Sequence, residues 1–287
     1  MFWACERRPP LILSRFCLKI YRVQTDDGGP PCYAIARDGD YLPFSEASPY
    51  GAALPGADFT GPKLPAADCQ LLAPVVPGKI VCVGRNYAAH ARELGNEVPA
   101  EPKLFLKPPS SVVGPETAII RPVHMSQLVH HEGELAVVLG RRLRRATQEE
   151  AAAAVFGYSI ANDVTARDIQ RAEGTFTRAK GFDTFCPIGP CVVTADAVGD
   201  PQQLDITLRV DGEIRQHGFT GDMVFSVYEL LAWISGVMTL EPGDVVLTGT
   251  PEGVGPLEPG NLVSVEIPSI GRLDNPVKDA DWTLQSR

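Results

Sequence analysis

Two glutamates stand directly before a long apolar run, and this arrangement constrains the chain more than any other feature of its sequence. The stretch 130–140 reads HHEGELAVVLG, and its apolar run ending at a glycine predicts a buried β-strand. Side chains alternate along a strand, so Glu132 and Glu134 should project from the same face. Two carboxylates beside a buried run repel each other and lose hydration, which calls for a compensating charge such as a divalent cation. The alternative is an exposed strand end that carries two solvated acids.

A third carboxylate follows a second predicted strand. Residues 155–161 predict that strand, and Asp163 comes just after it in the stretch IAND. An aspartate in this place is often a turn or cap residue. If it instead meets Glu132 and Glu134, the three form an oxygen site that favours Mg²⁺, Mn²⁺ or Ca²⁺ over zinc. His130 and His131 are further candidate ligands, but we expect structural or supporting roles for them, because three carboxylates suffice for Mg²⁺ with water.

A histidine and a glutamate are spaced to meet on one face of a short helix. Residues 88–94 predict this helix, and His90 and Glu93 lie three positions apart in it. A carboxylate beside a histidine can orient the ring as a general base. Pairs of this kind are also common as plain contacts on helix surfaces.

Several other polar residues are candidates for a site. Lys180 is flanked by small and apolar residues, so it could neutralise the carboxylates or hold a substrate oxyanion. Arg167 and Asp168 could equally form an ordinary surface pair. The glycine-rich loop 248–255 follows a predicted strand, but it matches neither nucleotide-binding glycine motif, so a nucleotide site is not expected.

Composition limits the partners and the compartment. The formal charge of −9 argues against nucleic acid and against an anionic membrane surface as partners. Seven cysteines without a C-x-x-C pair favour reduced thiols in a cytoplasmic protein over disulfides or a zinc site. No apolar run approaches transmembrane length, and charged residues and prolines near the N-terminus argue against a signal peptide.

Short strands dominate the predicted elements, which favours a β-rich α+β fold with a rolled or barrel-like sheet. Helices are predicted mainly at 148–154 and 225–238. Residues 43–67 are rich in proline, glycine, alanine and serine and predict an irregular linker. The predicted organisation is a disordered extension at 1–17, a small N-terminal β domain at 18–73, a catalytic domain at 78–277 and a C-terminal tail at 278–287.

Taken together, these motifs resemble the fumarylacetoacetate hydrolase family. The matching stretches are VGRNYAAH at 83–90, FLKP at 105–108, HEGEL at 131–135, NDVTARDIQ at 162–170, KGFDTFCP at 180–187 and TGTP at 248–251. The resemblance covers roughly residues 78–277, and the segment 18–73 looks like the N-terminal domain of some bacterial members. The family fold is a mixed β-sandwich roll, usually a homodimer.

The resemblance also implies roles for particular residues. It implies Mg²⁺ or Mn²⁺ at Glu132, Glu134 and Asp163, and a catalytic pair of His90 and Glu93 on a segment that closes as a lid over the substrate. The implied catalytic and substrate contacts also include Arg85, Tyr87, Arg167, Gln170, Lys180 and Thr250.

The implied substrate is a small anionic 2-oxo acid that binds the metal through its carboxylate and keto oxygens. We expect cleavage of a C–C bond in a 2-oxo or 2,4-dioxo acid, as in an acylpyruvate hydrolase or an oxaloacetate decarboxylase. Isomerisation of 2-hydroxyhepta-2,4-diene-1,7-dioate (5-carboxymethyl-2-hydroxymuconate) is the second hypothesis. A non-catalytic protein that binds oxo acids through a metal and a structural domain stabilised by Ca²⁺ are hypotheses of other classes, and fold alone does not decide among them.

Overall fold

The computed structural model describes residues 18–45, 47–52 and 62–281, and the extension predicted at 1–17 lies outside these ranges. Strands dominate the described ranges, where they form three sheets with a mixture of antiparallel and parallel pairs. The predicted β-rich α+β fold is therefore confirmed. Among the described residues, no helix has the length and apolar character needed to cross a membrane.

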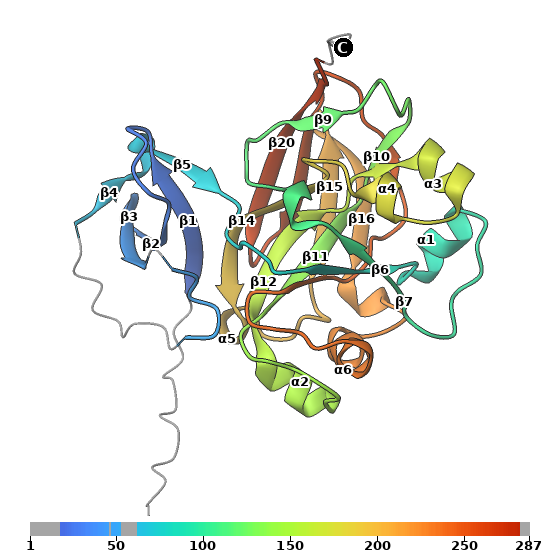
Figure 1. Cartoon of the computed structure of the whole chain (residues 1–287), viewed down its shortest axis with the longest axis horizontal. Helices are drawn as coiled ribbons and strands as arrows, with labels where there is room; N and C mark the ends of the chain where they lie inside the picture. The colour runs from blue at the N-terminus through green and yellow to red at the C-terminus, as the bar shows by residue number, and fades with distance from the viewer. Residues whose placement is uncertain (1–17, 46, 53–61, 282–287) are drawn as a thin grey trace, which may run out of the picture.

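The largest sheet has twelve strands in the described part of the chain, and it extends from the N-terminal strands at the left of Figure 1 to β6 and β7 near α1. Its strands lie in the order β4-β3-β2-β1-β14-β12-β11-β17-β6-β7, with β5 beside β1 and β8 beside β14. The bounds are β1 Lys19–Thr25, β2 Cys32–Arg37, β3 Asp40–Ser45, β4 Leu64–Pro65, β5 Cys69–Leu72, β6 Ile80–Gly84, β7 Lys103–Lys107, β8 Val112–Val113, β11 Gly133–Leu139, β12 Val155–Asn162, β14 Cys186–Thr194 and β17 Val245–Leu247.

The N-terminal strands β1 to β5 form the antiparallel unit at the left of Figure 1. Strand β1 also pairs with β14, with Ile20 opposite Val192, so backbone hydrogen bonds join the unit to the main sheet. The treatment of 18–73 as a separate domain stays a prediction.

Two smaller sheets complete the fold. They contain β10 Val129–His131, β13 Thr165–Ala166 and β18 Gly255–Pro256 in one, and β9 Ile119–Arg121, β15 Asp205–Val210, β16 Glu213–Phe219, β19 Leu262–Ile267 and β20 Gly271–Asp279 in the other. The five-stranded sheet packs against the main sheet, and their facing apolar side chains form the core. Gly133 shows how close the layers come, because a Cβ there would lie 3.1 Å from Val265 and 3.2 Å from Leu208.

Among the described residues, six α-helices lie around this sandwich. They are α1 Ala88–Glu93, α2 Gln148–Ala154, α3 Arg167–Glu173, α4 Thr177–Lys180, α5 Ala195–Val198 and α6 Val227–Val237. Helices α2 and α6 pack together at one end, and each begins with a capping box, built on Thr147 and on Ser226. Helices α1, α3 and α4 gather at another edge, beside the ends of β6, β7 and β10 (Figure 1).

Two sequence expectations need correction. The predicted linker 43–67 contains the end of β3 and the short strand β4, and these strands pair through Tyr41 and Leu64 in spite of their prolines. Positions 46 and 53–61 of that linker lie outside the described ranges. Strand β20 continues through Asp279, because it pairs with β9 there, so the first residues of the predicted C-terminal tail belong to the sheet.

The strand predicted over 130–140 is also interrupted, and this interruption positions the site. Strand β10 pairs with β13 and β18, whereas β11 pairs with β12 and β17, so the chain changes sheets at Glu132. At the change, the Glu132 amide donates to Asn162 Oδ1 at 2.9 Å, and the Asp163 amide donates to the Glu132 carbonyl at 2.8 Å. These two hydrogen bonds join Glu132 to the end of β12 and therefore bring Asp163 against Glu132.

Candidate active site

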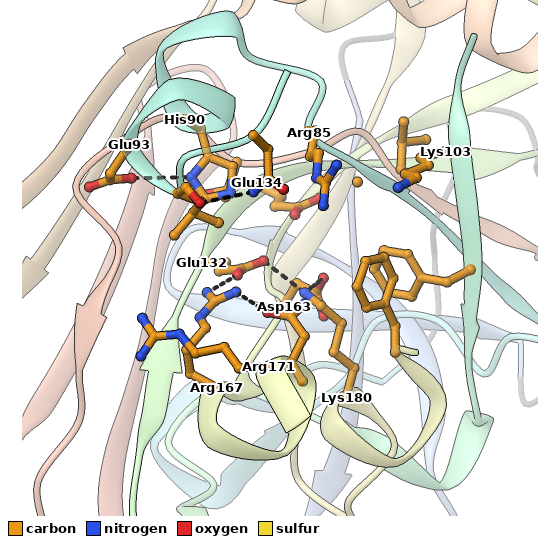
Figure 2. A pocket seen from close by; sticks show the side chains of 18 of the residues that line it. Arg85, His90, Glu93, Lys103, Glu132, Glu134, Asp163, Arg167, Arg171 and Lys180 are labelled. Carbon is orange, nitrogen blue, oxygen red and sulfur yellow. Dashed lines mark hydrogen bonds and ion pairs between the residues drawn. The ribbon is translucent and has the colours of Figure 1, made fainter. Parts of the chain in front are cut away.

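Three acidic side chains meet in a cavity of about 430 Å³. Glu132, Glu134 and Asp163 are all buried, and each offers one oxygen that lies within 4.8 Å of the others. Figure 2 shows these carboxylates across the middle of the cavity, with His90 and Arg85 on one side and Lys180 on the other. Segments that are distant in sequence thus converge as the motif analysis predicted.

Basic side chains surround two of the three carboxylates. Lys180 Nζ donates to Glu132 Oε2 at 2.8 Å and to Asp163 Oδ2 at 2.5 Å, while Arg167 also pairs with Glu132. Burial alone would raise the pKa of Glu132, but Lys180 and Arg167 outweigh it and hold that pKa well below its usual range. Of the two roles considered for Lys180, neutralisation of the carboxylates matches these contacts.

Glu134 has a different environment. Its Oε2 accepts a hydrogen bond of 2.7 Å from the Gly249 amide, and it forms no ion pair with any described residue. Burial and the neighbouring charges of Asp163 and Glu132 raise the pKa of Glu134 well above its ordinary value. Among the described residues, no lysine or arginine pairs directly with this carboxylate, and the charge of Lys180 offsets its acidic neighbours only in part.

The donor set fits a hard divalent cation. Three carboxylates supply only oxygen ligands, which suits Mg²⁺ or Mn²⁺. A divalent cation among them would also provide the charge that Glu134 lacks. His130 and His131 contribute no atom to the cluster. Burial lowers the pKa of both rings to about 4, and His131 Nδ1 lies 3.3 Å from Gln216 Oε1, which agrees with the structural role expected for it.

The predicted histidine–glutamate pair is present at the wall of the same cavity. His90 Nδ1 lies 3.2 Å from Glu93 Oε2, and the buried ring lines the cavity. The other carboxylate oxygen of Glu93 accepts a bond of 3.0 Å from the Gly253 amide. Because a carboxylate can only accept, Nδ1 carries the proton and Nε2 of the neutral ring is left as a base.

Most of the predicted substrate contacts line the cavity. Arg85, Arg167, Gln170 and Thr250 all do so, and Arg167 Nη1 donates to Gln170 Oε1 at 2.5 Å. Tyr87 does not line the cavity. It occupies the N-cap position of α1 without a side-chain capping bond, and its buried hydroxyl has no hydrogen-bond partner among the described residues.

The surface pair considered for Arg167 and Asp168 does not form. Arg167 points inward to Glu132, whereas Asp168 accepts bonds from the Ser126 hydroxyl at 2.6 Å and the Gln127 amide at 2.8 Å. Successive residues at the start of α3 point in different directions, which explains why neighbours in sequence do not pair.

Lys107 is a site residue that the sequence reasoning missed. Its Nζ donates to Asp163 Oδ1 at 2.7 Å, and both side chains are almost completely buried. A lysine at the end of an apolar strand, in the stretch KLFLK, is the signal that could have identified it.

Replacing Lys107 by Met is expected to lower the free energy of unfolding of the metal-free protein by about 3 kcal/mol. The methionine would leave the buried Asp163 carboxylate with Lys180 as its one remaining ion-pair partner. Urea denaturation measures the change, and Lys107→Arg, which keeps the charge, should lose less. Equal stability of wild type and Lys107→Met would show that this ion pair makes no net contribution.

Comparisons with known proteins agree with this geometry. The family model described as fumarylacetoacetate (FAA) hydrolase C-terminal matches residues 79–278, a range that contains the three carboxylates and His90. The chain is 44% identical over 270 residues to Protein Rv2993c of Mycobacterium tuberculosis, covering 91% of this chain and 98% of that protein. It is 46% identical over 226 residues to human mitochondrial oxaloacetate tautomerase FAHD2A, covering 75% of this chain and 72% of that protein.

A solved structure extends the comparison to the whole fold. The crystal structure of 2-hydroxyhepta-2,4-diene-1,7-dioate isomerase from Mycobacterium marinum matches with a TM-score of 0.81 and 41% sequence identity. The match covers 92% of this chain and 100% of that chain, so it includes N-terminal strands as well as the core. The resemblance inferred from the motifs and the predicted mixed β-sandwich roll are both confirmed.

Proposed function

The chain belongs to the fumarylacetoacetate hydrolase family, and we propose that it is a divalent-metal-dependent enzyme that moves a proton at the carbon beside the keto group of a small 2-oxo acid. The observation that carries this proposal is the presence of an oriented base, His90, in the same cavity as three buried carboxylates. Members of the family are enzymes, and the relatives named above include a tautomerase and an isomerase. Both of those reactions shift a proton between atoms of the substrate and break no C–C bond.

Different residues of the chain would hold the metal, transfer the proton and orient the substrate. A divalent cation held by Glu132, Glu134 and Asp163 would supply the charge that binds the 2-oxo group and makes the neighbouring C–H more acidic. His90 Nε2 is free to take that proton, and Glu93 fixes the ring and stabilises its charged form. Arg167, which already touches Gln170, is placed in the wall to orient substrate oxygens, and Thr250 lines the same wall while its hydroxyl donates to the Gly133 carbonyl. Return of the proton to another atom of the same substrate completes a tautomerisation or an isomerisation.

Cleavage of a C–C bond, which the sequence analysis favoured, is the second candidate. Here the same His90 would take a proton from water, and that water would attack the distal carbonyl of a 2,4-dioxo acid such as acetylpyruvate. The cavity of about 430 Å³ has room for a small substrate together with a water molecule. Decarboxylation of oxaloacetate needs no activated water and would leave His90 with a smaller role.

A substrate panel distinguishes these reactions. With Mg²⁺ or Mn²⁺, the purified protein is expected to accelerate the approach of oxaloacetate to keto–enol equilibrium, followed by the ultraviolet absorbance of the enol. Pyruvate release from oxaloacetate or acetylpyruvate, measured with lactate dehydrogenase, would identify cleavage as the reaction. No turnover of either compound, combined with metal-dependent ligand binding in calorimetry, would favour a non-catalytic binding protein.

We also propose that the protein acts as a homodimer in the cytoplasm, with no nucleic acid or membrane as partner. The acidic net charge of −9 and the family resemblance support this proposal. Light scattering of the purified protein measures the oligomeric state directly.

A further inference from the structure

We propose that Arg85 and Lys103 form a subsite for a second carboxylate of the substrate, so that the cavity selects 2-oxo dicarboxylates over 2-oxo acids with an uncharged end. This assignment rests on the proposed function, because the three acidic residues must hold the 2-oxo end of the molecule.

An excess of unpaired basic side chains is the first support. Two of the five lysines and arginines that line the cavity, Arg167 and Lys180, pair with its acids. The other three, Arg85, Lys103 and Arg171, form no ion pair with any described residue. In a protein of net charge −9, three cations without partners at one cavity favour the binding of an anion.

Two of the unpaired cations, Arg85 and Lys103, lie at the adjacent ends of the paired strands β6 and β7. Lys103 begins β7 directly opposite Gly84, the last residue of β6, and Arg85 follows Gly84. Figure 2 shows both side chains on the side of the cavity opposite Arg167 and Arg171. A carboxylate can therefore meet an arginine and a lysine there, and such charge-assisted hydrogen bonds are among the strongest.

The backbone of Arg85 supports a functional role for this residue. Its φ is 62°, a left-handed backbone conformation that residues other than glycine, asparagine and aspartate seldom adopt. Asn86 fixes the turn, because its amide side chain donates to the Thr248 carbonyl at 2.8 Å and to the Phe225 carbonyl at 3.0 Å. Strained residues of this kind cluster at functional sites.

Strand β7 links the proposed subsite to the metal site. Lys103, Phe105 and Lys107 alternate with their neighbours, so they share one face of the strand. Lys107 bonds to Asp163, Lys180 Nζ lies 4.9 Å from the centre of the Phe105 ring, and Lys103 stands at the far end. Four residues of strand span about 13 Å between the Cα atoms of the two lysines, and the long side chain of Lys103 can shorten that gap. An elongated substrate with an acid at each end suits this arrangement.

Calorimetry with matched ligands tests the subsite without turnover. In the presence of Mg²⁺, the wild type is expected to bind 2-oxoglutarate at least about 10-fold more tightly than 2-oxovalerate, which has five carbons but only one carboxylate. The six-carbon pair, 2-oxoadipate and 2-oxohexanoate, should show the same preference. Lys103→Gln and Arg85→Asn should each reduce the preference several-fold, and the double variant should abolish it. Asparagine suits the left-handed backbone at position 85, so this variant is expected to fold.

The controls separate this inference from the proposed function. Lys278→Gln removes the same charge from an exposed position on β20 that does not line the cavity, and it should keep the wild-type preference. Equal binding of the two ligands of a pair by the wild type would overturn the subsite and leave the proposed function standing. Absence of Mg²⁺-dependent binding of any of the four ligands would overturn both. Loss of the preference in Arg171→Gln, with no loss in Lys103→Gln, would move the subsite to α3 and refute our assignment.

Discussion

Replacing Glu134 by Gln is expected to abolish divalent-metal binding and to reduce metal-dependent turnover by about 10³-fold or more. The substitution removes one of three oxygen ligands and one negative charge from the cluster. It should leave the fold intact, because the one hydrogen-bond partner of the Glu134 carboxylate among the described residues is the Gly249 amide, and a glutamine carbonyl can accept that bond as well. No lysine or arginine loses an ion-pair partner in this variant.

In the absence of metal, the wild type and Glu134→Gln should differ in how their stability depends on pH. Burial, with the charges of Asp163 and Glu132, raises the pKa of Glu134 above its ordinary 4.5 in the folded protein. The neutral carboxyl group therefore contributes stability that is fully present below about pH 4.5 and is lost as the pH rises through the raised pKa. Glutamine does not ionise, so metal-free Glu134→Gln should be at least as stable as wild type near neutral pH.

Thermal denaturation with and without Mg²⁺ or Mn²⁺ checks both parts of this prediction. Wild type should gain stability with metal, and Glu134→Gln should not. Asp163→Asn is the informative comparison, because it takes a charged partner from both Lys107 and Lys180 and should destabilise the metal-free protein strongly. A metal-induced shift that persists unchanged in Glu134→Gln would contradict the proposed site.

The acidic cluster was predictable from the sequence because its chemistry is unusual in a buried strand. Glu132 and Glu134 stand before an apolar run that has to be buried, so the sequence itself requires a charge partner for them. The contact between His90 and Glu93 was likewise predictable from their spacing, since residues three apart on a helix are neighbours. The many short predicted strands indicated the β-rich fold, and the motifs in their order indicated the family.

The remaining features depend on contacts that no local pattern records. The break between β10 and β11 at Glu132 follows from pairing with four other strands, and periodicity within the stretch 130–140 does not reveal it. Lys107 was missed because a lysine is usually exposed, and its burial is explained by partners far along the chain, the Asp163 carboxylate and the Val164 carbonyl. Tyr87 was placed at the substrate through its motif, but it is not among the residues that line the cavity.

Replacing His90 by Ala is expected to lower kcat by about 10² to 10⁴-fold while metal binding stays unchanged. His90 is not one of the three clustered ligands, so the metal-induced rise in melting temperature should match that of the wild type. The loss should fall on kcat more than on KM, because proton transfer acts in the transition state and the substrate's oxygens are held by other residues.

The variant Glu93→Gln distinguishes the contribution of the base, His90, from that of Glu93, which positions it. The amide can keep the bond from the Gly253 amide, but it no longer stabilises a charged imidazole or specifies which ring nitrogen carries the proton. We therefore expect a smaller loss of kcat than in His90→Ala, and no further loss when the two changes are combined, because both act through one ring. Turnover kinetics of the two single variants and the double variant test this. Full activity of His90→Ala toward oxaloacetate would remove the pair from the mechanism and favour decarboxylation at the metal site alone.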